Sequence, residues 1–598
     1  MDMHRVRRSC RRLREEQSGI ALVIALSLLA AMSILGALYV ALSATESQIA
    51  VNENLATKAL MMAETGWNVA FKEFANVNFN DYTHNANLSY PPTSYLEWIT
   101  VPNIVVDNAE NNGLRDERNN GDFVWEWQPG DANMSLSGTN LPESFRFKIY
   151  PRTAEAGEDE FYVEATGRVG NATRILRIGV FKDSGYDYAI FSDGDMGEFT
   201  RGRDQTIGGR IHANGDICFR PESGQTLSIV TEGLTCTGQM IRSRDVWGRD
   251  APPGSTVEIK DGDGVWQEME GGDPGTAFDS ENAAWTDADS TNGIEGALEK
   301  WDGIVRDGQL GGEYIKPPDL SAMETGGYFE RKAALRIHGG DSQTTSSGVE
   351  ISDDLGDAIK EVTFYNANLD EYVTVQEIDV AALSASGYFP SNGLLFADRP
   401  IRLSNADELL SPLTVVASNS VYTKGNFNSV DKKPASILTT GRVWHVSSSW
   451  KDEEEYTKGD LTKRQASNGT TTINAAIVDA VPVVNEANWA DLDGDGTPDG
   501  YSGDCWANSD FLLEVWGGGP ERMLVKRGSI MHLQKANMAD DPETNILDEP
   551  GEIAWQKHSH YMPPVRDYAY DPDLESPWNQ PPFALYVAKV FSWEEVVP

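Results

Sequence analysis

The chain has 598 residues, a length that suggests about four structural units at roughly 150 residues per domain. Its 92 acidic residues outnumber 49 lysines and arginines, so its formal net charge is -43. A surface this acidic repels nucleic-acid phosphates, which excludes nucleic acid as an expected partner.

The first 19 residues are basic and precede a long apolar run. They hold six arginines, whereas residues 20–44 contain neither a charge nor a proline. These 25 residues would form about 37 Å of helix, enough to cross a bilayer. The positive-inside rule keeps the arginine-rich end in the cytoplasm and exports the chain after Glu46. An uncleaved signal anchor is the simplest interpretation, because a secretory signal has a shorter apolar core.

Beyond Ala44 the sequence predicts that the same helix becomes amphipathic and continues to about residue 75. Apolar residues recur there at roughly helical spacing among charged and polar ones. The apolar positions are Ile49, Leu55, Leu60, Ala63, Trp67, Val69 and Phe74. We therefore expect one helix that begins in lipid and ends on a globular domain.

The basic leader (residues 1–19), the Ser18-Gly19 pair and the apolar helix resemble a prepilin-type signal. The stretch GIALVIALSLLAAMSILGALYVAL, with the residues that follow to about position 75, looks like the N-terminal region of PilX-like minor pilins. The resemblance implies that a prepilin peptidase cleaves between Gly19 and Ile20, and that the new N-terminus is methylated. It implies a single-pass precursor in the bacterial inner membrane with its N-terminus in the cytoplasm. The mature chain (residues 20–598) would then join other pilins in a periplasmic or extracellular pilus.

Ile24 occupies the fifth position of this mature chain, where ordinary pilins carry a glutamate. In the pilin family that carboxylate neutralises the N-terminal ammonium of the neighbouring subunit, since a charge inside an apolar bundle requires a partner. A subunit at the tip has no neighbour above it, so the resemblance implies a tip position. The same residue fits a protein that never enters a filament.

Residues 76–185 are expected to form a small domain like the antiparallel sheet that pilins pack on their helix. Apolar and polar residues alternate in 161–165 and again in 176–180, on either side of Gly170-Asn171. Alternation around a two-residue turn predicts an antiparallel hairpin.

Residues 186–598 are expected to form a large β-rich exported domain. Short apolar pairs lie between Asn-Gly, Asp-Gly and Gly-Gly turns, which favours a β-solenoid or β-helix, with a β-sandwich as the alternative. The acidic residues at about 243–330 are interpreted as an insertion. In the C-terminal half, the series PLTVVASNSVYTKGNFN, KKPASILTTGRVWHVSSSW and FLLEVWGGGPERMLVKRGSIMHL resembles the pattern of large PilX-like and pilus-assembly-associated proteins. The predicted fold class is α+β: a long N-terminal helix, a small antiparallel sheet and this large domain.

A candidate calcium loop lies at residues 491–499. Its possible ligands are the carboxylates of Asp491, Asp493, Asp495 and Asp499 and the carbonyl oxygen of Thr497. Hard oxygen ligands in this number and spacing suit Ca²⁺, although the full EF-hand pattern is incomplete. A solvated Asp-Gly turn is the alternative.

Four cysteines are too few for a disulfide-built scaffold, and no C-x-x-C spacing occurs. Cys218 and Cys236 would lie in an oxidising compartment after export, so a disulfide between them is one expectation. A pairing of Cys505 with either of them is the alternative.

No catalytic motif stands out, and we do not expect an enzyme. The sequence lacks H-E-x-x-H, G-x-S-x-G and P-loop patterns. The resemblance implies a minor pilin-like subunit of a type IV pilus or related pseudopilus, which initiates assembly at the tip or adheres to a surface or glycan. The alternatives are a signal-anchored surface binding protein that never assembles, and a β-helix enzyme that acts on polysaccharide.

Overall fold

The computed structural model describes most of the chain. The described residues are 3–74, 99–100, 114–119, 122–127, 143–151, 160–197, 203–219, 221, 223–242, 253–270, 278–286, 296–339, 342–366, 371–452, 466–482, 511–512, 514, 516, 521–535, 564–576 and 579–596.

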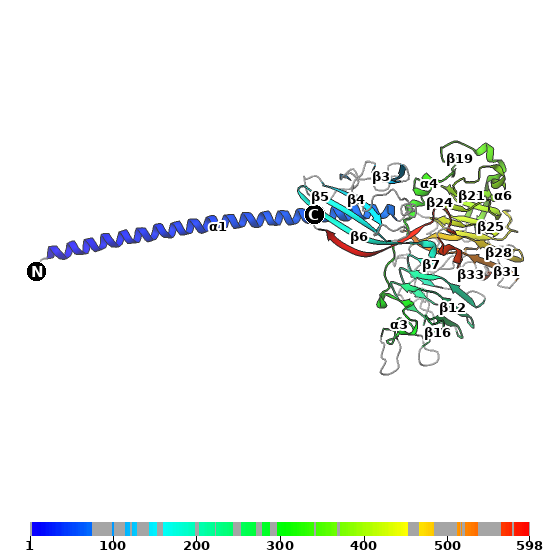
Figure 1. Cartoon of the computed structure of the whole chain (residues 1–598), viewed down its shortest axis with the longest axis horizontal. Coiled ribbons are helices and arrows are strands. Elements are labelled where there is room, and N and C mark those ends of the chain that lie inside the picture. The colour runs from blue at the N-terminus through cyan, green and yellow to red at the C-terminus, as the bar shows by residue number, and fades with distance from the viewer. Residues whose placement is uncertain are drawn as a thin grey trace.

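A single long helix, α1 (Met3–Phe74), forms the N-terminal part of the molecule and extends far beyond the β-rich part (Figure 1). Its 72 residues correspond to about 108 Å of helix. The predicted continuity of the apolar and amphipathic segments in one helix is confirmed.

A five-stranded antiparallel sheet, which we call the helix-bearing sheet, packs on the second half of α1. The predicted hairpin is confirmed: β5 and β6 meet at Gly170-Asn171, and the φ angle of Gly170 is 57°. The last strand of the chain, β34, lies beside β6 and completes the sheet (Figure 1). The sheet order is β1 (Ile99–Thr100), β4 (Glu143–Pro151), β5 (Glu160–Val169), β6 (Ala172–Ser184) and β34 (Tyr586–Val596). A separate hairpin pairs β2 (Leu114–Asn119) with β3 (Asp122–Trp127).

After β6 the chain winds away from this sheet in turns of three short strands, the lower turns. Each strand runs parallel to its counterpart in the next turn, because every turn repeats the same path one strand spacing further on. One row is β7 (Tyr188–Ser192), β10 (Arg210–Ala213), β13 (Leu234–Cys236) and β17 (Val305–Arg306). The other two are β8 (Met196–Gly197), β11 (Ile217–Cys218) and β14 (Met240–Ile241), then β9 (Gln205–Gly208), β12 (Thr226–Val230) and β15 (Thr256–Lys260), with β16 (Trp266–Glu268) antiparallel at the end.

The remaining strands form the upper turns, in which the chain alternates between two sheets. One row is β18 (Leu335–His338), β22 (Leu394–Ala397), β24 (Leu413–Ala417), β26 (Ala435–Thr439), β29 (Ala476–Pro482) and β32 (Ile530–Lys535). The other is β21 (Glu371–Asp379), β23 (Ile401–Glu408), β25 (Val421–Val430), β28 (Gly469–Asn474), β31 (Arg522–Arg527) and β33 (Val565–Ala569). Beside β25 lie β27 (Val443–Val446) and β30 (Phe511–Leu512), and at the outer end lie β19 (Ser342–Thr345) and β20 (Ile359–Asn366). Short helices α3 (Ala297–Lys300), α4 (Tyr328–Lys332), α5 (Ser352–Leu355) and α6 (Val380–Ser386) fill connections.

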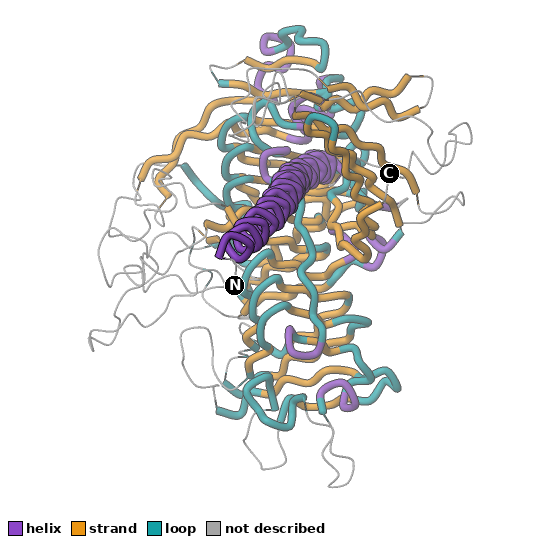
Figure 2. The backbone as a smooth tube through the Cα atoms, turned by 90° about the vertical axis from the view of Figure 1, so that its left-hand side faces the viewer, coloured by secondary structure: helices purple, strands orange, loops and turns teal. Residues whose placement is uncertain are grey.

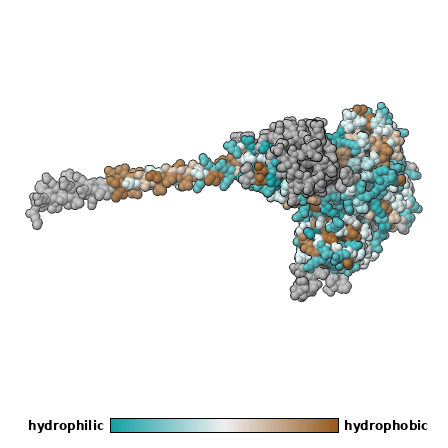
Figure 3. Space-filling view, viewed as in Figure 1, coloured by the Kyte–Doolittle hydropathy of each residue, from teal (hydrophilic) through white to brown (hydrophobic). Residues whose placement is uncertain are grey.

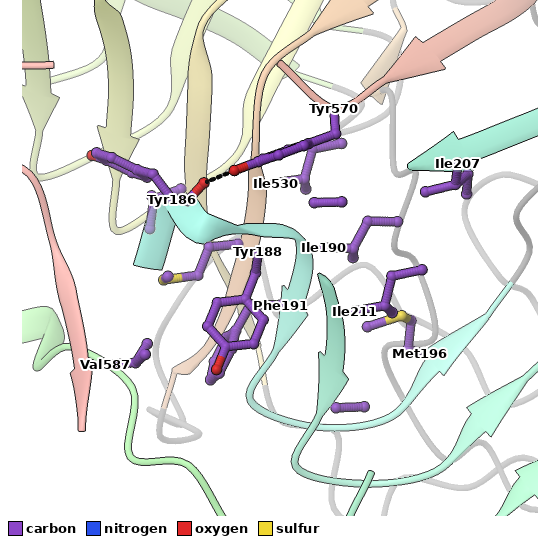
Figure 4. Close-up of a cluster of buried hydrophobic side chains, with 14 of the residues drawn as sticks. Tyr186, Tyr188, Ile190, Phe191, Met196, Ile207, Ile211, Ile530, Tyr570 and Val587 are labelled. Carbon is purple, nitrogen blue, oxygen red and sulfur yellow. Dashed lines mark hydrogen bonds between the residues drawn. The ribbon is translucent and has the colours of Figure 1, made fainter. Parts of the chain in front are cut away.

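The two sets of turns share one continuous 11-stranded sheet, because β32 pairs in parallel with β7. Figure 2, viewed along α1, shows the turns stacked on both sides of the helix axis. Apolar side chains fill the junction, and the hydroxyl of Tyr570 donates a hydrogen bond of 3.0 Å to the carbonyl of Tyr186 (Figure 4). Strands β22, β24 and β26 are buried along their whole length, since both faces of the sheet are covered there.

Three strands from residues 243–330, a segment that we interpreted as an insertion, are built into the lower turns. β15 and β17 are members of its sheets. Phe278, Trp285 and Trp301 pack with ring centroids 5.4 to 5.8 Å apart and close the end of the core. Aliphatic residues spread through this acidic segment, such as Val257, Ile259 and Val305, are buried with the tryptophans in the same core.

The α+β class is confirmed: a long helix precedes several sheets. The narrower assignment as a β-solenoid or β-helix stays a prediction, which the parallel winding supports.

Candidate functional site

The first half of α1 is an apolar rod without cover from the rest of the chain. Every large apolar side chain described between Leu22 and Val51 is more than half exposed, and Figure 3 shows this part of the helix as a hydrophobic segment. The helix contains a stretch long and apolar enough to cross a membrane. An apolar surface of this extent marks contact with lipid or with other proteins.

From Leu55 onward one face of α1 is buried on the helix-bearing sheet. The buried positions recur at three- and four-residue steps, as the amphipathic pattern predicts. They are Ala59, Met62, Ala63, Gly66, Trp67, Ala70 and Phe71. Ile49 was predicted to belong to this face, but it is exposed, because the helix has already passed the edge of its packed partners there.

Two glycines let the helix and the sheet approach closely. A Cβ atom at Gly167 on β5 would collide with the backbone of Ala59 and Ala63 in α1. A Cβ atom at Gly66 would lie 2.9 Å from the ring of Phe145. Backbone atoms cannot move aside as a flexible side chain can, so Gly167 fixes the distance between the two elements.

A row of alternating charges crosses the opposite face of the sheet. Lys148, Glu164, Arg177 and Glu594 lie in register on β4, β5, β6 and β34. Arg177 donates to Glu164 at 2.9 and 3.0 Å and to Glu594 at 3.0 Å, and Lys148 lies 3.1 Å from Glu164. Opposite charges on facing strands stabilise their pairing. The row therefore spans four strands, with its buried contacts at Glu164 and an exposed contact at Glu594.

β34 also contacts the helix directly. The ring of Trp593 meets Trp67 edge-on with centroids 6.3 Å apart, and Phe591 and Ser592 cover the bare backbone of Gly179. Ala588 is buried in the same core as the helix. The C-terminus is thus a structural part of the surface that holds α1.

A second connection joins this surface to the lower turns. The backbone of Lys316 exchanges two hydrogen bonds with Ala588, at 2.9 and 3.1 Å, and its ammonium lies 5.2 Å from the ring centroid of Phe71. Asn214 holds the preceding residue, Ile315, through bonds of 2.7 and 2.9 Å. Helix, last strand and β-rich part therefore form a single packed unit.

The sequence-predicted sites have different outcomes. Gly19 and Ile20 lie in the continuous helical backbone of α1, which leaves cleavage there a prediction. The candidate calcium loop, with Asp491, Asp493, Asp495, Thr497 and Asp499, lies outside the described residues. Among the described residues no cluster of three or more potential metal-ligating His, Cys, Asp or Glu side chains occurs.

The expected disulfide between Cys218 and Cys236 is not formed in the structure, which holds both as free, buried thiols. Burial raises the pKa of the Cys236 thiol far above its ordinary value, and the nearby carboxylates of Asp307 and Asp216 add to the effect. A thiol in this setting is unreactive. Cys505 lies outside the described residues.

The closure of the helix-bearing sheet by β34 was missed in the sequence. Residues 586–596 read YVAKVFSWEEV, a β-branched and aromatic run. That composition predicts a strand, but it does not indicate which strand pairs with it. The partner, β6, lies some 400 residues earlier, and the pairing register is set by the fold.

No family model matches the chain, and no curated protein matches it significantly. Among solved structures, the competence-associated pilin ComZ from Thermus thermophilus is similar over 91% of this chain and 98% of that chain, with 12% identity and a TM-score of 0.25. A TM-score this low does not establish a shared fold.

Proposed function

We propose that the chain is a minor pilin-like subunit of a type IV pilus or related pseudopilus. The observation that carries the proposal is the division of α1 into an exposed apolar half and a half locked onto the helix-bearing sheet. The first half would lie in the inner membrane before assembly and among the helices of other pilins afterwards. The second half would hold the exported part of the chain at a fixed position on the filament.

A tip position is supported by the size of the β-rich part and by the absence of a carboxylate at residue 24. The β-rich part extends on both sides of the helix axis, so copies repeated along a tightly packed filament would collide (Figures 1 and 2). Ile24 offers no carboxylate to a neighbouring N-terminus. At the tip the subunit would initiate assembly or contact a surface.

The N-terminus of the protein extracted from membranes tests this proposal. Mass spectrometry should find a mature chain that begins at Ile20, methylated, because prepilin peptidase removes the basic leader. In a Gly19→Leu variant the precursor should accumulate with its leader attached. Gly36→Leu is the matched control, since Gly36 lies in the same helix with open space around it, and it should mature normally.

An intact Met1 in the wild type, or normal maturation of Gly19→Leu, would contradict the proposal and support the signal-anchor alternative. Absence of the protein from purified filaments would contradict its assembly into a pilus.

A further inference from the structure

One sheet of the upper turns divides in the middle of β25. Residues Val421 to Lys424 pair with β27, whereas Phe427 pairs with Ile473 of β28. Between these points Gly425 has a φ of 77°, which interrupts the regular ladder. The neighbouring strand β23 also shifts register after Ser404, where Asn405 has a φ of 50°. Bulges in adjacent strands open the surface at this place.

A polar pocket of about 300 Å³ occupies this opening, at the lower end of the size range of small-ligand sites. Its lining comes from four neighbouring parallel strands and from the residues next to β27 and β28. Apart from two glycines, every described lining residue is polar. Its members include the charged side chains of Glu377, Asp407 and Lys424, the amide of Asn426 and the hydroxyl of Ser404.

Buried ionic contacts hold one wall of the pocket. The guanidinium of Arg402 is buried and binds Glu377 and both carboxylate oxygens of Asp452. Burial alone would raise the pKa of Glu377, but the hydrogen bond and charge of Arg402 outweigh it and lower that pKa below its ordinary value. Glu377 therefore stays ionised and accepts a further hydrogen bond of 2.8 Å from Ser404.

Lys424 and Asp407 present opposite charges to the same space. Lys424 is half-buried and makes no hydrogen bond or ion pair with any residue that the structure describes. Asp407 accepts one bond of 2.9 Å from the amide of Asn426, through a single carboxylate oxygen. Within the described part of the chain, the ammonium of Lys424 and one carboxylate oxygen of Asp407 therefore have no hydrogen-bond partner and can meet a ligand.

The charges decide the chemical class of that ligand. An anion would meet the carboxylates of Glu377 and Asp407 in a chain with a net charge of -43. A bare metal cation would meet the ammonium of Lys424. A neutral hydroxyl group both donates and accepts, so it satisfies the two kinds of group at once. We propose that this pocket binds one sugar residue of a neutral glycan.

Saccharide binding to the full chain in detergent tests the inference. Chitotriose, maltotriose and cellotriose would be titrated separately and followed by isothermal calorimetry. At least one should bind, and Lys424→Met and Asp407→Asn should each raise its Kd at least tenfold. Glu408→Gln is the matched control, because Glu408 is exposed beside Asp407 but does not line the pocket, and it should leave the Kd unchanged.

Melting temperatures equal to that of the wild type would confirm that the variants fold. The inference is overturned if none of the three saccharides binds at millimolar concentration, or if both pocket variants bind as tightly as Glu408→Gln. Binding of inorganic phosphate in place of the saccharides also overturns it. None of these results depends on cleavage after Gly19, so the glycan site and the pilin-like proposal fail separately.

Discussion

His212 shows how a single ring is fixed inside the lower turns. Its Nε2 lies 2.9 Å from Asn214 Oδ1, which also accepts the amide of Ile315, and its Nδ1 lies 2.7 Å from the hydroxyl of Thr235. An acceptor at one nitrogen and a hydroxyl at the other suit the neutral ring with its proton on Nε2. Burial lowers the pKa of His212 from 6.5 to about 4.

We therefore predict a loss of stability in mild acid. The unfolded chain takes up this proton below pH 6.5 and the folded chain only below about pH 4, so unfolding is favoured progressively across that window. The loss amounts to about 3 kcal/mol over the whole window at about 1.4 kcal/mol per pH unit. Thermal unfolding between pH 7.5 and 4.5 should show a steeper fall in Tm for the wild type than for His212→Gln. Equal slopes would contradict the assignment.

The contact at Gly167 gives a second prediction at this scale. Gly167→Ala should destabilise the packing of α1 on its sheet by about 1 to 3 kcal/mol, because the added methyl collides with helix backbone. Gly233→Ala is the control, since nothing lies within 4 Å of a Cβ atom there. Hydrogen exchange of the β5 amides should accelerate in the first variant and not in the second.

Single residues of this kind could be predicted only in part. The alternation around Gly170-Asn171 located the hairpin, because a local pattern contains that information. The roles of Gly167 and His212 depend on elements that meet only in the folded chain. Nothing near them in the sequence indicates the close approach or the hydrogen-bond network.

Among the elements, the order of the helix-bearing sheet has the clearest energetic consequence. Glu164 is almost completely buried and is held by Arg177 and Lys148 from the two flanking strands. Glu594 is more than half exposed, so its contact with the same arginine is weak.

Arg177→Met should therefore cost about 2 kcal/mol or more in the stability of this sheet, because it removes two charge-assisted hydrogen bonds from the buried carboxylate of Glu164. Glu594→Gln should cost less than about 0.5 kcal/mol. Hydrogen exchange of β5 and β6 amides in the two variants provides the comparison. A larger effect from Glu594→Gln would show that the row stabilises the sheet mainly through the last strand.

At the scale of the whole molecule, the first strand of the lower turns pairs with the last strand of the upper turns at the centre of one sheet. The chain enters the β-rich part at β7, winds outward to β17, crosses to the opposite end at β18 and winds back until β32 rejoins β7. The sequence predicted a long helix, a small sheet and a turn-rich β domain. It could not predict this two-way path, because the short strands carry no strict repeat from which an order could be read.

At this scale the calcium loop remains a prediction that thermal unfolding can check. If Asp491 to Asp499 bind Ca²⁺, saturating calcium should raise Tm relative to chelator by about 5 °C, as expected for a ligand near 100 times its Kd. A paired Asp493→Asn and Asp495→Asn variant should lose the shift, since it removes two charged ligands. An unchanged Tm in the wild type would contradict the site.

If the chain is exported as we propose, the pairing of β6 with β34 determines when the helix-bearing sheet can be completed. The N-terminal helix would be synthesised first, but the sheet on which it packs would stay incomplete until the residues up to 596 had been exported. If export stopped before that point, β6 would be an unpaired edge strand, which could pair with strands of other chains. Only a chain exported through β34 would present the complete helix-bearing sheet to a growing filament.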